Sequence, residues 1–234
     1  MKTLAAAARS LAFYLVFYGG TALLVLAALV AVSLRRGWLH ALVRVWGAFH
    51  LWCVRRLAGI EVVIEGALPR TAALIAIRHE SFFEAIDTAR LFDRPAVFAK
   101  QELFRIPGWG WLAHRYGLIP VARDRGAVAL RAMLGEAKAR LAEGRALVIF
   151  PEGTRVPHGR RVALQAGFAG LYKLLGLPVV PIAVDSGPTY HRLIKRPGQI
   201  TYKVGETIPA GLPREQIEAR VEAAINALNP PLRP

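Results

Sequence analysis

The chain has 234 residues, enough for one domain with a sizeable core and an appended segment. Apolar residues make up 54% of it, above the roughly 45–50% of an average soluble domain, and the excess falls near the amino terminus. Its 31 Lys and Arg outnumber 16 Asp and Glu, and the net charge of +15 favours anionic partners such as lipid headgroups, nucleic acid or an acidic carrier protein. The single cysteine, Cys53, excludes an internal disulfide and fits a protein that faces a reducing cytosol.

A long uncharged run lies near the start of the chain. No charged residue occurs from Leu11 to Leu34, and about 20 apolar residues are enough to span the hydrocarbon core of a bilayer. The alternative is a cleaved signal peptide, but the apolar region of such a peptide is normally about 7–15 residues long. The run therefore favours a retained membrane anchor, either a full span or a hairpin that enters from one side.

The next segment, Trp38–Gly59, mixes aromatic residues with Arg, which is typical of a helix at the membrane interface. Arginine pairs at 35–36 and 55–56 close the two segments, so both ends are expected at one anionic, cytoplasmic leaflet. The alternative is a second helix buried in the folded domain. We expect residues 1–59 to form a membrane anchor, with a hydrophobic helix and an amphipathic helix, and residues 60–234 to form the functional domain.

From residue 61 onward, short apolar runs alternate with helical patterns. This alternation predicts an α/β fold, with a mixed sheet flanked by helices and preceded by the hydrophobic membrane-anchoring helical segment. The predicted strands are Glu61–Glu65, Ala72–Ile77, Ala96–Ala99, Leu118–Val121, Ala146–Phe150, Val179–Val184 and Ile200–Val204. The predicted helices are Phe82–Leu91, Ala127–Glu143, Gln165–Leu175 and Arg214–Leu228. The stretch from Lys100 to Trp111 is expected to be an amphipathic connector.

The segment from Arg78 to Glu84 is the first that suggests chemistry. His79 follows a predicted strand, and the carboxyl ends of such strands commonly line the ligand crevice of an α/β sheet. On one continuous helix His79 and Glu84 would point about 140° apart, so they meet only if His79 lies in the turn before the helix. Glu84 would then orient the imidazole, and the other ring nitrogen would take a proton from a hydroxyl group.

A purely structural explanation exists for part of this pattern. Ser81-x-x-Glu84 is also a capping box, in which serine and glutamate satisfy the free amides of the first helical turn. Capping alone does not account for His79 at the end of a strand. A zinc site is disfavoured because no second His or Cys lies at ligand spacing.

Three further segments follow predicted strands or lie in them. Phe150–Arg155 contains a flexible glycine, Gly153, and an arginine suited to phosphate. Gly117–Arg123 ends in a cation, and Val179–Val184 is interrupted by Pro181, which predicts an edge strand or a strand end near a crevice. An ordinary turn with a surface arginine is the alternative for the first of these.

Together, the four segments resemble, in order and spacing, the glycerolipid acyltransferases typified by 1-acylglycerol-3-phosphate O-acyltransferase. His79-x4-Glu84 is similar to the family's His-x4-Asp motif, with Glu in place of the usual Asp. Phe150–Arg155 matches its Phe-Pro-Glu-Gly-Thr-Arg block, and Lys100–Leu103 is similar to its Lys-x-Glu-Leu element. The resemblance covers about Glu61 to Val204, and the extra methylene of Glu84 still allows contact with an imidazole.

The resemblance implies a role for each matching residue. It makes His79 the general base and Glu84 the group that orients it. It points to Arg123 and Arg155, and more weakly to Lys100, as partners of the acceptor's phosphate. The rest of the expected substrate site consists of Glu152, Gly153, Thr154 and Pro181. The backbone amides near Gly153 and Thr154 are the expected donors to the oxyanion.

The implied reaction is direct transfer of a fatty acyl group from acyl-acyl carrier protein or acyl-CoA to the sn-2 hydroxyl of 1-acylglycerol-3-phosphate, making phosphatidic acid. We expect no metal and no cofactor besides the thioester co-substrate. The expected partners are anionic membrane lipids, a lysophospholipid acceptor and the carrier protein or CoA donor, with no nucleic acid. The expected location is the cell inner membrane, with the catalytic domain facing the cytoplasm.

Two alternatives remain open at this point. One keeps the chemistry and changes the acceptor to another lyso-lipid, such as lyso-ornithine lipid. The other is a non-catalytic basic protein that binds membranes, in which the motifs are relics.

Overall fold

The computed structural model describes residues 2–34, 37–69, 73–122 and 126–230. Within them, seven strands form one sheet in the order β1-β7-β6-β2-β5-β3-β4. All neighbouring strands run parallel except β6 and β7, so the sheet is mixed, as predicted. The strands are β1 (Ile60–Glu65), β2 (Leu74–Ile77), β3 (Ala96–Lys100), β4 (Ile119–Val121), β5 (Leu147–Ile149), β6 (Val179–Val184) and β7 (Gly198–Val204). Ala72, the predicted start of the second strand, lies outside the described residues.

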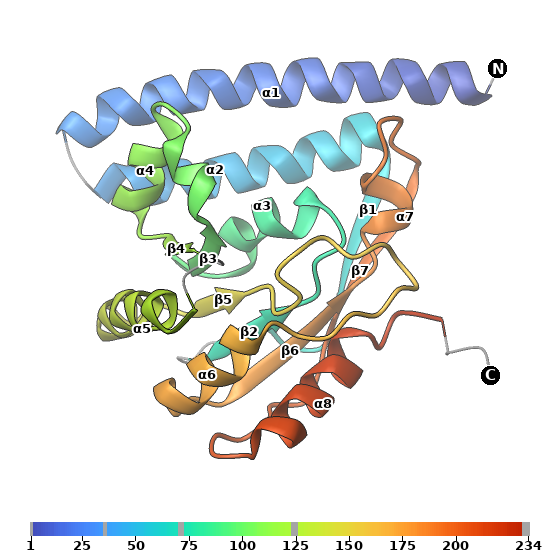
Figure 1. The fold of residues 1–234 in the computed structure, drawn as a ribbon. Helices are drawn as coiled ribbons and strands as arrows, with labels where there is room; N and C mark the ends of the chain where they lie inside the picture. Colours follow the sequence, from blue (N-terminus) through green and yellow to red (C-terminus); the bar gives the residue numbers. More distant parts are fainter. Residues whose placement is uncertain (1, 35–36, 70–72, 123–125, 231–234) are drawn as a thin grey trace.

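Helices cover both faces of the sheet (Figure 1). On one face lie α5, α6 and α8; on the other, α3 packs next to the sheet and the long α1 and α2 lie above it. The helices are α1 (Lys2–Leu34), α2 (Gly37–Cys53), α3 (Phe82–Leu91), α4 (Trp109–Tyr116), α5 (Gly126–Ala142), α6 (Ala166–Leu175), α7 (Gly187–Tyr190) and α8 (Arg214–Ile225). A π-helical turn, η1 (Val54–Ala58), follows α2, and a 3-10 turn, η2 (Gln101–Arg105), follows β3.

The central strand β2 shows why the sheet is buried on both faces. Successive side chains of a strand point to opposite faces. Leu74 and Ala76 join the core beneath α5, α6 and α8, whereas Ile75 and Ile77 join the core beneath α3. A strand that is apolar at every position is therefore required here, and the sequence Leu-Ile-Ala-Ile supplies it.

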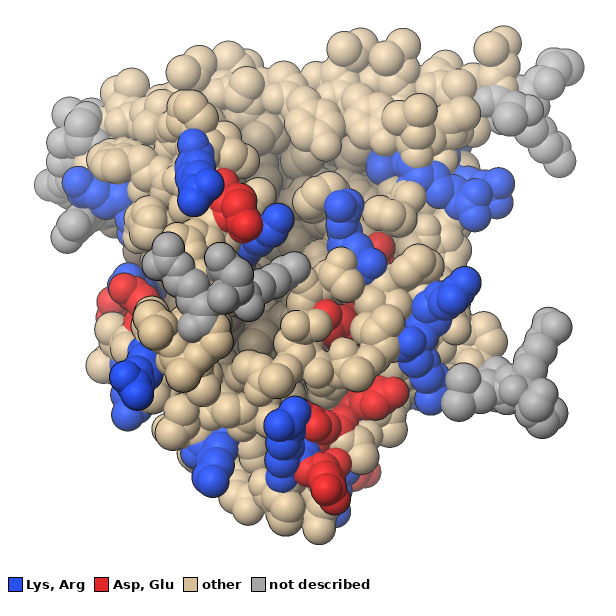
Figure 2. Space-filling model, viewed as in Figure 1, with Lys and Arg blue, Asp and Glu red and all other residues tan. Residues whose placement is uncertain are grey.

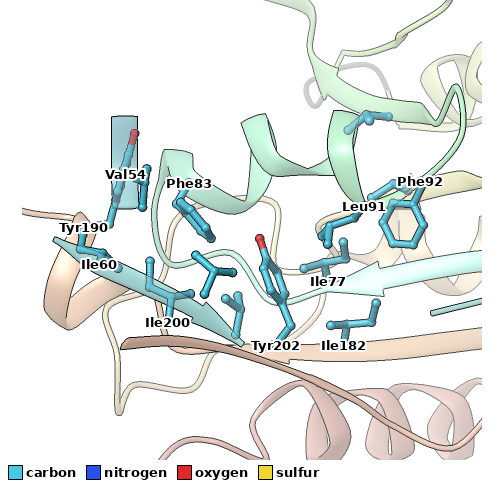
Figure 3. Close-up of a cluster of buried hydrophobic side chains, with 14 of the residues drawn as sticks. Val54, Ile60, Ile77, Phe83, Leu91, Phe92, Ile182, Tyr190, Ile200 and Tyr202 are labelled. Atoms are coloured by element: carbon cyan, nitrogen blue, oxygen red, sulfur yellow. The ribbon is translucent and has the colours of Figure 1, made fainter. Parts of the chain in front are cut away.

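The core beneath α3 also anchors the helix that contains Glu84. Figure 3 shows Phe83 of α3 pointing toward the sheet, with Tyr202 and Ile200 of β7 nearby. The rings of Phe83 and Tyr202 lie 6.0 Å apart, and Phe83 is fully buried. This packing fixes the height of α3 above the sheet and therefore the position of the next residue, Glu84.

Helix α1 has one buried and one exposed apolar face. Phe13 and Phe17 are buried against the domain, whereas Leu11, Leu15 and Leu23 are 59%, 67% and 69% exposed. In Figure 2 the upper edge of the molecule, where α1 lies, carries few charged side chains. By length and composition, the part from Leu4 to Val32 is suited to crossing a membrane. These features fit membrane association of the amino-terminal helix.

Helix α2 has features of both predictions for its segment, an amphipathic interfacial helix and a helix buried in the folded domain. Leu39, Gly47 and His50 are buried, while Trp38 and Trp52 on the same helix are about half exposed. A Cβ added at Gly47 would lie 3.3 Å from the backbone of α3, so glycine permits the close approach of the two helices. The helix is therefore amphipathic and also part of the folded domain. The arginine pair at 35–36 lies outside the described residues.

The connector from Lys100 to Trp111 contains η2 and the start of α4, which the short, glycine-rich and proline-rich sequence did not reveal. One expectation about local structure is wrong. Strand β6, which contains Pro181, is not an edge strand, because β7 and β2 flank it. Pro181 is tolerated because its missing N–H falls in an interruption of the pairing, between the β7 ladder that begins at Ile182 and the isolated bridge of Val179 with Ile208.

Replacing Phe83 by Ala should lower the midpoint of thermal unfolding by about 10 °C, because the substitution leaves a cavity in the core. Phe82 provides a matched control, since it is the preceding residue on α3 and is 54% exposed. Phe82→Ala should change the midpoint little. Equal effects of the two substitutions, measured by circular dichroism in detergent, would contradict this packing.

Candidate active site

Four parallel strands bring the candidate residues to one edge of the sheet. In the order β6, β2, β5, β3, each strand runs parallel to its neighbour. Their carboxyl ends therefore meet at the same edge, where an α/β sheet usually binds its ligand. The residues that follow these strands are Ser186, His79, the segment Phe150–Arg155 and, at the last position of β3, Lys100.

His79 and Glu84 form a direct pair at this edge. His79 lies in the turn between β2 and α3, and Glu84 lies in the first turn of α3. His79 Nδ1 is 2.9 Å from Glu84 Oε1. A carboxylate can only accept hydrogen bonds, so Nδ1 carries the proton and Nε2 keeps its lone pair. Within the described residues Nε2 has no hydrogen-bond partner, and the side chain is 16% exposed.

Glu84 also belongs to a capping box. Ser81 is the N-cap of α3, its hydroxyl accepts from the backbone N–H of Phe83, and Glu84 accepts from the backbone N–H of Ser81 at 2.7 Å. Its Oε1 further accepts from the backbone N–H of Glu80 at 2.6 Å. The capping and orienting roles are therefore compatible, because one carboxylate oxygen serves the helix terminus and the imidazole together.

The second oxygen of Glu84 is held by two hydroxyl groups. Ser186 Oγ lies 2.6 Å and Ser81 Oγ 3.1 Å from Glu84 Oε2. Burial raises the pKa of this fully buried carboxyl, but the hydrogen bond and charge of His79 and the bonds from Ser186 and Ser81 outweigh burial and lower it. Glu84 is therefore ionised at neutral pH and provides a fixed negative charge beside the imidazole.

A buried arginine lies directly before His79. Arg78 is 1% exposed, and its guanidinium donates to Glu80 at 2.8 Å and to Glu152 at 3.1 Å. It also contacts the side chain of Asn226, at the end of α8, and the backbone oxygen of Arg160. These contacts satisfy a charge that would otherwise be costly to bury, and they tie the loop after β5 and the end of α8 to the turn that contains His79.

Glu152, an expected substrate-site residue, contacts the backbone of His79. Its Oε2 accepts from the backbone N–H of His79 at 2.7 Å, and the side chain is 1% exposed. Burial raises the pKa of this carboxyl to about 7, although the His79 amide and Arg78 act in the opposite direction. The residue does not line the cavity described below. Its position therefore points to fixing the backbone of the catalytic turn.

The loop after β5 packs directly on the pair. The ring of Phe150 stacks on His79, with centroids 4.4 Å apart, and the backbone N–H of Val156 donates to the carbonyl of His79 at 2.7 Å. Gly153 has a φ of +69°, a conformation that favours glycine. Its N–H donates to the carbonyl of Phe150 at 2.9 Å, so the expected oxyanion contact from Gly153 is already engaged within the turn. The Thr154 amide has no acceptor within the described residues.

A cavity of about 830 Å³ opens beside His79. Its lining is mainly apolar and comes from α1, α2, α3, α4, α5 and α6, so it extends between the amino-terminal helices and the sheet. The residues of the predicted site that line it are His79, Lys100, Gly153, Thr154 and Arg155. A large apolar cavity with a few convergent polar groups is the usual form of a small-molecule site.

The cations predicted to bind phosphate have different surroundings. Arg155 is exposed, and its guanidinium lies over the ring of Phe82 at 4.1 Å. Lys100 is about half exposed and lies 3.6 Å from Glu102. Arg123 lies outside the described residues. Pro181 is buried within the sheet and does not line the cavity.

Sequence reasoning missed the residues that hold the pair in place. Ser186 follows β6, so the argument from strand ends that selected His79 would have selected it too. Arg78 and Glu80 flank His79, and a charged residue directly after a buried strand is itself a signal. Within the described residues, no group of three His, Cys, Asp or Glu side chains is placed to hold a metal ion.

The sequence profile of the family described as Acyltransferase matches residues 59–185, more than half of the chain. The chain belongs to this acyltransferase family, among the glycerolipid acyltransferases that its motifs resemble. The match covers the turn with His79, the loop after β5 and strand β6.

Two relatives from Pseudomonas aeruginosa illustrate the range of the family. A 1-acyl-sn-glycerol-3-phosphate acyltransferase is 30% identical over 169 residues, which are 70% of this chain and 66% of that protein. A lyso-ornithine lipid O-acyltransferase is 31% identical over 198 residues, 74% of this chain and 75% of that protein. The chain spans just under two thirds of the first relative and 58% of the human 1-acyl-sn-glycerol-3-phosphate acyltransferase beta.

The fold is shared with a solved structure. The crystal structure of PlsC, the 1-acyl-sn-glycerophosphate acyltransferase from Thermotoga maritima, superposes with a TM-score of 0.69. The similarity covers 97% of this chain and 94% of that one at 21% identity. It therefore includes the amino-terminal helices as well as the sheet.

Replacing Glu152 by Ala should destabilise the protein by about 2 kcal/mol or more, because Arg78 and the His79 amide each lose a buried acceptor. Glu152→Gln keeps one acceptor oxygen and should lose less. Thermal unfolding of the two variants beside the wild type measures the difference. An unchanged midpoint in Glu152→Ala would contradict the supporting role of this carboxylate.

Proposed function

We propose that this protein transfers a fatty acyl group from acyl-acyl carrier protein or acyl-CoA to the sn-2 hydroxyl of 1-acylglycerol-3-phosphate, making phosphatidic acid. One observation carries the proposal: the His79–Glu84 pair lies at an apolar cavity of about 830 Å³ that also has Arg155 and Lys100 in its lining. The pair suits proton abstraction, the cavity suits acyl chains, and the two cations suit a phosphate.

The proposed reaction is a single direct transfer. His79 Nε2 takes the proton of the acceptor hydroxyl while Glu84 stabilises the resulting imidazolium. The acceptor oxygen attacks the thioester carbonyl carbon, and the C–S bond breaks as the tetrahedral intermediate collapses. The proton on the imidazolium is then available to the departing thiolate. The Thr154 amide is the proposed donor to the oxyanion, because Gly153 already donates within its turn.

The amino-terminal helices support a membrane location for this chemistry. We propose that residues 1–59 anchor the protein in the cell inner membrane and that residues 60–234 form the acyltransferase domain, facing the cytoplasm. The cavity is lined in part by α1 and α2, whose outer surface is apolar. A lysolipid can then reach His79 while its own acyl chain stays in an apolar environment.

A second acceptor is supported by one of the comparisons. The lyso-ornithine lipid O-acyltransferase of P. aeruginosa is as similar to this chain as the glycerolipid relative is. Such an acceptor requires the same proton transfer but no phosphate contact. The two proposals therefore differ in what they require of the cations.

The catalytic test compares wild type with His79→Ala. Acyl transfer from labelled acyl-acyl carrier protein and acyl-CoA is measured in membranes at matched expression. We expect kcat to fall by about 10²-fold or more, the lower end of general-base contributions. His114→Ala, which removes an exposed histidine outside the cavity, is the control and should retain activity. A fully active His79→Ala variant would refute the mechanism.

The acceptor test uses Arg155→Ala with both lysolipids. Loss of a charge-assisted contact to phosphate should raise the KM for 1-acylglycerol-3-phosphate by roughly tenfold or more. Arg161→Ala removes an exposed arginine of the same loop that does not line the cavity, and its KM should match wild type. Activity on lyso-ornithine lipid alone, unaffected by Arg155→Ala, would exclude the glycerolipid acceptor.

A further inference from the structure

Ser186 contacts the catalytic carboxylate from a part of the chain outside the motif segments. It lies two residues after the end of β6 and immediately before α7, and it is fully buried. Its Oγ donates to Glu84 Oε2 over 2.6 Å and lies 2.7 Å from Ser81 Oγ. A serine before a helix usually caps it, but the Ser186 side chain makes no capping bond with α7. The hydroxyl is therefore directed to Glu84 and not to its own helix.

The two oxygens of Glu84 have different partners. Oε1 accepts from His79 Nδ1 and from the backbone amides of Glu80 and Ser81. Oε2 accepts only hydroxyl groups, of which Ser186 is the closer. The last torsion of a glutamate side chain is broad, so backbone donors at one oxygen do not by themselves fix the carboxylate plane. A donor at the second oxygen is required for that.

We propose that Ser186 is a positioning residue that holds the Glu84 carboxylate with Oε1 directed at His79. The inference rests on the proposed acyl transfer, in which the His79–Glu84 pair takes the acceptor's proton. Ser186 does not line the cavity, so its role is exerted through Glu84 and not through contact with a substrate.

The two serine hydroxyls surround Glu84 Oε2 and lie 2.7 Å from each other. Each hydroxyl has a single proton, and Ser186 donates its proton to Glu84. Ser81 accepts from the Phe83 amide, and its own proton is shared between Glu84 Oε2 at 3.1 Å and Ser186 Oγ at 2.7 Å. Because hydrogen bonds in such a cluster polarise one another, the contact with Ser81 strengthens the bond from Ser186 to Glu84.

The charge around the pair determines the expected effect of pH. The titratable and charged groups facing it are Arg78 and Glu80 from the β2–α3 turn, Glu152 and Arg155 from the loop after β5, Tyr190 and His191 from α7 and the loop after it, and Tyr202 from β7. None of these contacts Glu84 Oε2. Loss of the Ser186 hydroxyl therefore leaves negative charge at that oxygen without its closest donor.

Ser186→Ala should lower kcat by roughly tenfold while leaving the KM for the acceptor unchanged, as for other partners that orient a reacting group indirectly. The acid limb of the pH profile of kcat/KM should move to higher pH. With fewer donors the carboxylate holds protons more readily and also stabilises the imidazolium more strongly. Both changes keep the pair protonated, and so inactive as a base, up to a higher pH.

Three controls separate positioning from a general structural effect. Ser186→Thr keeps the hydroxyl and should restore the pH profile. Thr189→Val, on the same short helix, removes a buried hydroxyl that reaches only the backbone of Ser186, at 3.4 Å, and should leave the profile unchanged. In a Glu84→Gln background, adding Ser186→Ala should cost little more, because both act on one group.

A readout without substrate distinguishes failure of this inference from failure of the proposed function. NMR titration of histidine rings in detergent, with His79→Ala as the assignment standard, should show the His79 ring titrating at higher pH in Ser186→Ala. This result is expected whichever lysolipid is the acceptor. Wild-type kcat and an unshifted His79 titration in a folded Ser186→Ala variant would overturn the role of Ser186. Inactivity of wild type on every lysolipid would overturn only the proposed function.

Discussion

The buried carboxylate of Glu84 is the interaction on which the rest of the site depends. It caps the first turn of α3 and contacts His79 Nδ1. It also accepts a hydrogen bond from the hydroxyl of Ser186, which follows the neighbouring strand β6. A buried ion without partners would be strongly destabilising, so these donors are needed for the fold as well as for chemistry. The position of α3 above the sheet, set by Phe83, therefore determines the geometry of the pair.

The sheet explains how distant segments supply these partners. β6, β2 and β5 are parallel neighbours, so the residues after them meet at one edge although more than a hundred positions separate His79 from Ser186. Arg78 extends the same arrangement to α8, through Asn226. Glu152 then fixes the His79 backbone and does not line the cavity. The turn with His79 and the start of α3 are thus held by the segments after β5, β6 and α8.

The sequence predicted local features well and remote partners poorly. The helix Phe82–Leu91 was predicted with its observed bounds, because Ser81 and Glu84 mark its start by short-range chemistry. The contact of His79 with Glu84 followed from the same boundary. Three features depend on which strands are neighbours in the sheet, and a single sequence does not contain that order. They are the contact of Glu152 with the His79 backbone, the burial of Pro181 and the hydrogen bond from Ser186 to Glu84. Helix α4 was missed because it has only eight residues and directly follows the turn-forming pair Pro107-Gly108.

The central claim is that one carboxylate both caps α3 and prepares His79 for proton transfer. Glu84→Gln separates these roles, because the amide oxygen can still accept from the backbone amides of residues 80 and 81 while the negative charge is lost. Acyl transfer and thermal unfolding should be measured on the same preparation of this variant. The account predicts a loss of activity of about 10²-fold or more with a much smaller loss of stability. Full activity combined with lowered stability would show that Glu84 is a cap alone and would contradict the account.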